Sequence, residues 1–81
     1  LQMHFVVCLT TPLTGEMIIW GVFDSFEEAQ KDTEMEFHKR GGVEKVLEDF
    51  EVAICQFIKD TMPHCWERNQ SGWSKYNHLD L

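Results

Sequence analysis

Residues 3–23 read MHFVVCLTTPLTGEMIIWGVF, which is two apolar runs joined by a short turn-forming segment. The runs Met3 to Leu9 and Glu16 to Phe23 are rich in β-branched and aromatic side chains, a composition typical of strands. Pro12 and Gly15 lie between them and are residues that favour turns. We therefore predict that the chain begins with an antiparallel β-hairpin.

Both faces of this hairpin are apolar, whereas a sheet with one solvated face alternates apolar and polar residues. The second face therefore needs a cover, provided either by the C-terminal segment or by another copy of the chain. If two copies pair to form a homodimer, the residues expected at the dimer contact are Val6, Ile18, Trp20 and Val22.

A helix is expected directly after the hairpin, because Ser25 and Glu28 form a Ser-x-x-Glu capping box. Asp24 is an alternative cap. Gly41-Gly42 is expected to end the helix. Met35 lies opposite the predicted buried stripe at 100° per residue. The stripe consists of Phe26, Ala29, Thr33 and Phe37.

The segment from Val43 to Thr61 fits a helical template better than a strand template. Nine of its positions share one helical face, and eight of these are apolar. A short helix followed by a strand from Glu51 to Ile58 fits less well, because Val52 to Cys55 are consecutive and apolar. We therefore predict one continuous helix that Pro63 ends.

One stripe of this predicted helix is an acidic row with a small apolar centre. It consists of Glu44, Glu48, Glu51, Val52 and Cys55. Such an arrangement fits either a partner contact with a polar rim or a packing contact with the C-terminal segment.

The C-terminal residues are rich in aromatic side chains. Cys65 to Arg68 and Trp73 to Asn77 flank a turn-rich loop and are expected to form a second hairpin or an irregular segment. Its aromatic residues are candidates to cover the open face of the first hairpin. Asn77 to Leu81 is expected to be a loose tail. The predicted architecture is one α+β domain, residues 1–81, with both helices on one face of an antiparallel sheet.

Acidic residues dominate the charge of the chain. The formal net charge is −7, and residues 24–51 hold ten acidic and four basic residues. Four of the acids form a ladder at i, i+4 spacing, where like charges repel by roughly 0.2–0.5 kcal/mol per pair. The ladder consists of Asp24, Glu28, Asp32 and Glu36. A basic protein surface is the expected partner, and direct contact with nucleic acid or a membrane is disfavoured.

Metal, thiol and catalytic chemistry find little support in the residue spacing. His4 and Cys8 are about 13 Å apart on a strand at 3.3 Å per residue, too far to share an ion. Three cysteines at scattered spacing predict no disulfide framework and favour a reducing, cytoplasmic location. No nucleotide-binding or catalytic motif is present. We therefore expect a protein that is not an enzyme and that uses no cofactor.

In size, acidity and lack of catalytic motifs the chain resembles the small acidic inhibitors of bacteriophages and mobile elements, anti-CRISPR and DNA-mimic proteins among them. The resemblance implies an inhibitor that docks on a basic, nucleic-acid-binding surface. It assigns no residue roles. The charge pattern selects the acidic partner-binding residues, which are Asp24, Glu28, Asp32, Glu36, Glu44, Glu48 and Glu51. Met35, Val52 and Cys55 are expected to add apolar contact beside them. The alternative is an assembly module that homodimerises through its apolar hairpin.

Overall fold

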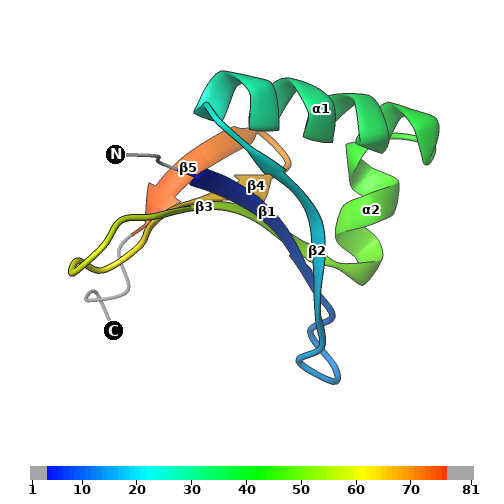
Figure 1. Cartoon of the computed structure of the whole chain (residues 1–81). Coiled ribbons are helices and arrows are strands. Elements are labelled where there is room, and N and C mark those ends of the chain that lie inside the picture. Colours follow the sequence, from blue (N-terminus) through cyan, green and yellow to red (C-terminus); the bar gives the residue numbers. More distant parts are fainter. Residues whose placement is uncertain (1–3, 77–81) are drawn as a thin grey trace.

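The computed structural model describes residues 4–76 and has the α+β architecture that the sequence predicts. Along the chain, the elements are β1 (His4–Thr10), β2 (Met17–Phe23), α1 (Phe26–Lys39), α2 (Val43–Asp49), β3 (Glu51–Phe57), β4 (His64–Asn69) and β5 (Gly72–Tyr76). The strands form one antiparallel sheet in the order β2-β1-β3-β4-β5. The sheet is strongly curved, and the helices lie on its convex side (Figure 1).

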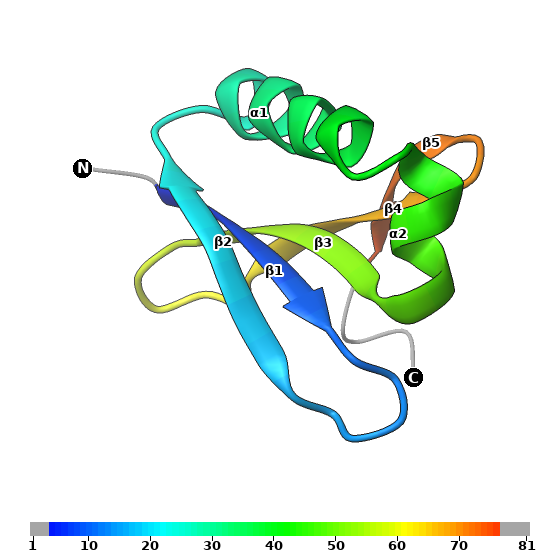
Figure 2. The same ribbon diagram turned by 90° about the vertical axis from the view of Figure 1, so that its right-hand side faces the viewer.

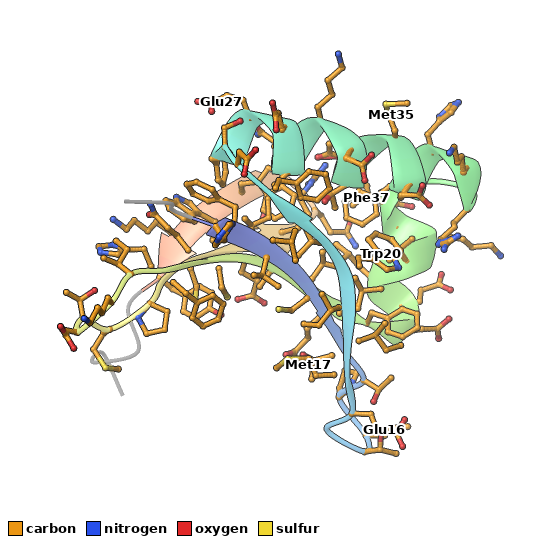
Figure 3. All side chains as sticks on the ribbon, in the orientation of Figure 1. Glu16, Met17, Trp20, Glu27, Met35 and Phe37 are labelled. Carbon is orange, nitrogen blue, oxygen red and sulfur yellow. The ribbon has the colours of Figure 1, made fainter. Side chains whose placement is uncertain are left out.

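The predicted N-terminal hairpin is present, and it contains a bulge. Val7 lies opposite Gly21 and Cys8 lies opposite Ile19, so Trp20 is an extra residue in β2. A bulge re-aims the side chain at the irregular position. The Trp20 ring accordingly lies 6.0 Å from the Phe37 ring of α1, between centroids (Figure 3).

Helix α1 begins and ends as its local sequence predicts. The Ser25 hydroxyl accepts a hydrogen bond from the Glu28 backbone N–H at 3.1 Å, which confirms the N-cap. At the other end, Gly41 and Gly42 have φ of +97° and +112°, and the Gly42 N–H donates to the Phe37 carbonyl at 2.8 Å. Glycine adopts these left-handed angles without a steric penalty, so the pair stops the helix.

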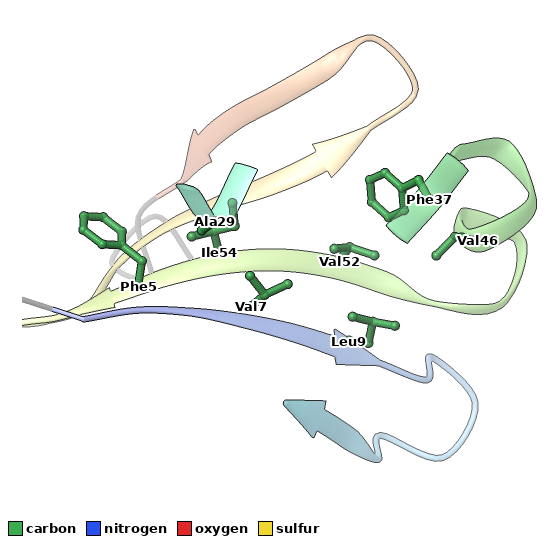
Figure 4. Packing of buried hydrophobic residues seen from close by; sticks show 8 residues of the cluster. All are labelled: Phe5, Val7, Leu9, Ala29, Phe37, Val46, Val52 and Ile54. Carbon is green, nitrogen blue, oxygen red and sulfur yellow. The ribbon is translucent and has the colours of Figure 1, made fainter. Parts of the chain in front are cut away.

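The hydrophobic core lies between the sheet and the two helices (Figure 4). Alternate residues of β1 and β3 meet the inner sides of α1 and α2 there. The core consists of Phe5, Val7, Leu9, Ala29, Phe37, Val46, Val52 and Ile54. Both helices therefore contribute to the same face of the sheet, as predicted.

The predicted helix from Val43 to Thr61 is wrong. Helix α2 ends at Asp49, Phe50 is extended (φ −137°, ψ 149°), and β3 follows. Strand β3 lies between β1 and β4. Val52 and Ile54 point into the core and are fully buried, and Ala53, Cys55 and Phe57 on the other face are also apolar. An interior strand of this kind gives a consecutive apolar run, which happened to fit the helical template.

Of the two alternatives expected for the C-terminal residues, the structure has the hairpin, although this hairpin does not cover the first one. Strands β4 and β5 extend the same sheet beyond β3. The rings of Trp66 and Trp73 pack against Phe26 of α1, at centroid distances of 4.8 and 6.3 Å. These two tryptophans therefore belong to the helix side of the sheet. The predicted tail from Asn77 to Leu81 lies outside the described residues.

The other face of the sheet carries no helix among residues 4–76. We call it the helix-free face, and its residues follow from the pairing register and the alternation of side chains along each strand. Its apolar members and thiols are Val6, Cys8, Met17, Ile19, Val22, Ala53, Cys55, Phe57, Cys65 and Tyr76. None of the described helices is long and apolar enough to span a membrane.

Candidate partner-binding surface

The acidic ladder divides into two parts in the structure. Asp24, Glu28 and Asp32 are exposed, and within the described part of the chain none of their carboxylates forms an ion pair. The Glu36 carboxylate, by contrast, lies 3.4 Å from Lys39 Nζ and 3.8 Å from an Arg40 nitrogen. Within the ladder, the carboxylates without an ion pair therefore lie before α1 and in its first half.

An open groove connects the ladder with the end of strand β2. Glu28 and Asp32 line it together with Phe23, Lys31 and Met35, and its volume is about 320 Å³. Met35 is 52% exposed and points outward from α1 (Figure 3). The predicted apolar contact at Met35 is thus next to two of the free carboxylates.

Glu34 has a structural role that the sequence did not indicate. Its carboxylate accepts a hydrogen bond from Arg68 Nε at 2.7 Å and one from Trp73 Nε1 at 3.2 Å. The Arg68 side chain is only 12% exposed. These bonds fix the β4–β5 hairpin to α1, and no local sequence signal relates residues so far apart in the chain.

The second predicted acidic stripe is not a continuous surface. Glu44, Glu48 and Glu51 are exposed, but Val52 is fully buried in the core and is unable to contact a partner. Cys55 lies on the helix-free face. These residues would share one stripe only if residues 43–61 formed a single helix. In the structure, helix α2 ends at Asp49 and strand β3 follows, so the residues point in different directions.

The acids of α2 also lie close to basic residues. Glu48 and Asp49 line an open groove of about 300 Å³ together with Arg40 and Lys45. The groove beside α2 is therefore lined by two acidic and two basic residues, whereas the groove beside the ladder is lined by two acidic residues and one basic residue.

The four residues predicted at a dimer contact do not share one face. Val6 and Val22 lie opposite each other on the helix-free face. Ile18 lies opposite the buried Leu9 and therefore points to the helix side. Trp20 packs on the helix layer, with the Arg40 guanidinium carbon 5.0 Å from its ring centroid. Only Val6 and Val22 remain candidates for a contact through the helix-free face.

Three free thiols gather on the helix-free face. Cys55 of β3 lies directly opposite Cys65 of β4, and it hydrogen bonds to Cys8 of the adjacent β1. That bond lowers the pKa of Cys8 to about 7 and raises the pKa of Cys55. Burial raises the pKa of Tyr76, which lies opposite Cys65. Across residues 4–76, no group of three or more His, Cys, Asp or Glu side chains is arranged to hold a metal ion.

Comparisons with models of known protein families, with curated proteins and with solved structures find no match for this chain.

Proposed function

We propose that this chain is a non-enzymatic binding protein that docks the acidic part of α1 on a basic surface of a partner protein. The observation that carries the proposal is the row formed by Asp24, Glu28 and Asp32, whose carboxylates are exposed and lack ion pairs among the described residues. Of the other three acids in the region, Glu34 and Glu36 pair with Arg68, Lys39 and Arg40, and Glu27 is exposed. Like charges kept in a row cost stability, and a complementary partner would relieve that cost.

A nucleic-acid-binding groove is the partner surface that suits this row best. Glu28 and Asp32 are four residues apart on α1 and therefore about 6 Å apart along its axis, since each residue rises 1.5 Å, while Asp24 precedes the helix. A groove that follows a phosphate backbone presents basic side chains in series. The row would occupy that groove and exclude nucleic acid, so the proposed activity is inhibition by competition.

Charge reversal at matched positions tests the proposal. The partner is first isolated from native cell extract with the unchanged protein as bait, and its association rate is then measured. In one variant Asp24, Glu28 and Asp32 become lysine. In the control variant Glu44, Glu48 and Asp49 of α2 become lysine, which changes the net charge equally.

The ladder variant should associate at least roughly tenfold more slowly, because electrostatic attraction mainly sets the association rate. The control variant should be affected less. Raising salt from about 50 to about 500 mM should slow association of the unchanged protein, because the Debye length shortens. A DNA duplex should compete for the partner. Equal rates for all three proteins at both salt concentrations would refute the proposal.

A second candidate function is an assembly module that homodimerises through the helix-free face. It is favoured by the exposure of apolar side chains there: Met17 is 63% exposed, Val22 57% and Phe57 51%. Sedimentation at micromolar concentration distinguishes the two functions. A dimer that Val22→Lys converts to a monomer would favour the module.

A further inference from the structure

Strand β2 is an edge of the sheet, and its outer side has no neighbouring strand among the described residues. In an antiparallel sheet, alternate residues of an edge strand direct their N–H and C=O groups away from the paired strand. Strand β2 therefore presents unpaired backbone donors and acceptors along its seven residues. Such a row is able to pair with another extended chain.

The two edges of the sheet differ in how well they resist such pairing. Proteins usually protect edge strands with short length, charged residues or proline. The opposite edge, β5, has five residues and carries Lys75, whose Nζ lies 5.6 Å from the Trp66 ring centroid. Strand β2 reads MIIWGVF, without a charge or a proline, and its one irregularity is the bulge at Trp20.

Apolar side chains are also unusually exposed along β2. Four of its seven residues have large hydrophobic side chains that are more than two-fifths exposed, namely Met17 (63%), Ile18 (46%), Ile19 (54%) and Val22 (57%). Three of these lie on the helix-free face. Figure 2 shows β2 at the outer margin of the sheet, below α1. A chain placed along this edge would therefore bury apolar area on one side and meet α1 on the other.

The charges next to β2 are predominantly negative. Glu16 and Asp24 adjoin its two ends, and Glu28 and Asp32 line the groove that Phe23 shares with α1. The basic side chains nearby are Lys31 in that groove and Arg40, which stacks on Trp20 and pairs with Glu36. Acidic side chains thus outnumber basic ones along the α1 side of the edge.

We propose that β2 accepts an extended segment of the basic partner as a sixth strand of the sheet. The proposal rests on the proposed function and names its mode of recognition. Side chains alternate across a strand, so the segment should carry apolar residues facing Ile19 and Val22 and lysine or arginine at the alternate positions facing Glu28 and Asp32. Backbone hydrogen bonds supply affinity, and the alternation supplies specificity.

A second copy of this chain fits the edge less well. Two β2 strands paired antiparallel about Trp20 would place Glu16 of each copy opposite Asp24 of the other. Like charges directly opposite each other destabilise a strand pair. Each copy also carries a net charge of −7. Charge complementarity therefore selects a basic strand as the occupant.

A synthetic peptide provides a direct test. The probe is a peptide of about eight residues, a typical strand length, that alternates valine with lysine. Two matched peptides serve as controls: one alternates valine with glutamate, and the other has the probe's composition with its valines and lysines in separate blocks. The measurement is amide hydrogen exchange of the whole protein, resolved by residue. The probe should slow exchange along β2 and leave β5 unchanged, and neither control peptide should do so.

Two protein variants distinguish the contribution of strand β2 to probe binding from that of the acidic row. Ile19→Lys adds a charge on β2, while Phe57→Lys adds the same charge at a residue of similar exposure (51%, against 54% for Ile19) that is not on an edge strand. Ile19→Lys should weaken probe binding at least roughly tenfold, equivalent to 1.4 kcal/mol, and Phe57→Lys should have little effect. Both variants must retain the circular dichroism of the unchanged protein. If Ile19→Lys unfolds the chain, Val22→Lys replaces it.

The outcomes distinguish this inference from the proposed function. If the isolated partner binds, and charge reversal at Glu28 and Asp32 slows it while Ile19→Lys does not, the acidic row acts alone and strand addition is wrong. If the probe gives no protection of β2, or the blocked peptide protects it equally, strand addition is also wrong. If the unchanged protein forms a dimer that only Ile19→Lys dissociates, the occupant is a second copy and the inference is overturned.

Discussion

The Glu34 carboxylate accepts a hydrogen bond from Arg68 Nε at 2.7 Å, joining helix α1 to strand β4 across 34 positions of the chain. The guanidinium is charged and mostly buried, with its side chain 12% exposed. A buried charge needs a partner, because its desolvation is not otherwise offset. This pair therefore does more for the fold than the exposed ion pairs on α1.

Glu34→Ala should lower the free energy of unfolding by about 2 kcal/mol, because it leaves Arg68 without its carboxylate and Trp73 Nε1 without its acceptor. Glu34→Gln should cost less, since the amide oxygen still accepts a hydrogen bond. Glu27→Ala, at an exposed position on the same helix, should stay within about 0.5 kcal/mol. Urea denaturation measures all three. An equal effect of Glu34→Ala and Glu27→Ala would contradict the assignment.

Locally encoded elements were predictable from the sequence. The α1 boundaries follow from the Ser25 cap and the Gly41-Gly42 stop, which act within a few residues. The β1–β2 hairpin follows from strand composition on either side of a turn. The bulge at Trp20 was missed, although the adjacent Gly21 is a signal for one, since glycine inside a strand pattern often marks a bulge.

Features set by tertiary pairing were not predictable in the same way. Whether residues 51–57 form a helix or a strand depends on β1 and β4 lying on either side of them, and those partners are distant in sequence. Of the predicted partner-binding residues, the α1 set is on the surface, but Val52 is in the core. The role of Glu34 and the open edge of β2 both depend on the order of strands in the sheet.

The effect of a substitution at Val52 tests directly whether residues 51–57 form strand β3 or part of a helix. In the core of an interior strand, Val52→Ala should cost roughly 1–3 kcal/mol, through lost apolar burial and the cavity left behind. On the exposed stripe of a helix the same change would be nearly neutral or stabilising. Glu51→Ala, at the exposed neighbouring position, is the control. A Val52→Ala effect as small as that of Glu51→Ala would argue against β3.

Gly21 is constrained by close approach to an aromatic ring. A Cβ at this position would lie 2.7 Å from Cε2 and 2.9 Å from Cζ of Phe23, so the ring would have to move. Gly21→Ala should therefore cost about 1–2 kcal/mol. In the background of Phe23→Leu, which removes the ring, the same substitution should cost much less. The difference between the two costs is a coupling energy, and its absence in urea denaturation would contradict the predicted clash.

The thiol cluster predicts how stability varies with pH. The hydrogen bond from Cys55 lowers the pKa of Cys8 from 9.0 to about 7, and the unfolded chain retains the ordinary value. Between pH 7 and 9 the unfolded state therefore binds more protons at Cys8 than the folded state does. The contribution of Cys8 to stability is fully present above pH 9 and is lost as the pH falls through about 7. The raised pKa of Cys55 acts in the opposite sense, destabilising the fold above its ordinary pKa.

Ultraviolet absorbance of the thiolate in the folded protein, followed as a function of pH, measures the pKa of Cys8 directly. One thiolate should appear with a midpoint near pH 7, and Cys8→Ser should abolish that step. Cys55→Ala should move the Cys8 midpoint back toward its ordinary value, because the donor that stabilises the thiolate is gone. Cys65→Ala leaves the bond between Cys8 and Cys55 in place, so the step should persist near pH 7. Stability of the unchanged protein should rise between pH 7 and 9 relative to that of Cys8→Ser. A midpoint that stays near pH 7 in Cys55→Ala would show that another group sets the pKa of Cys8.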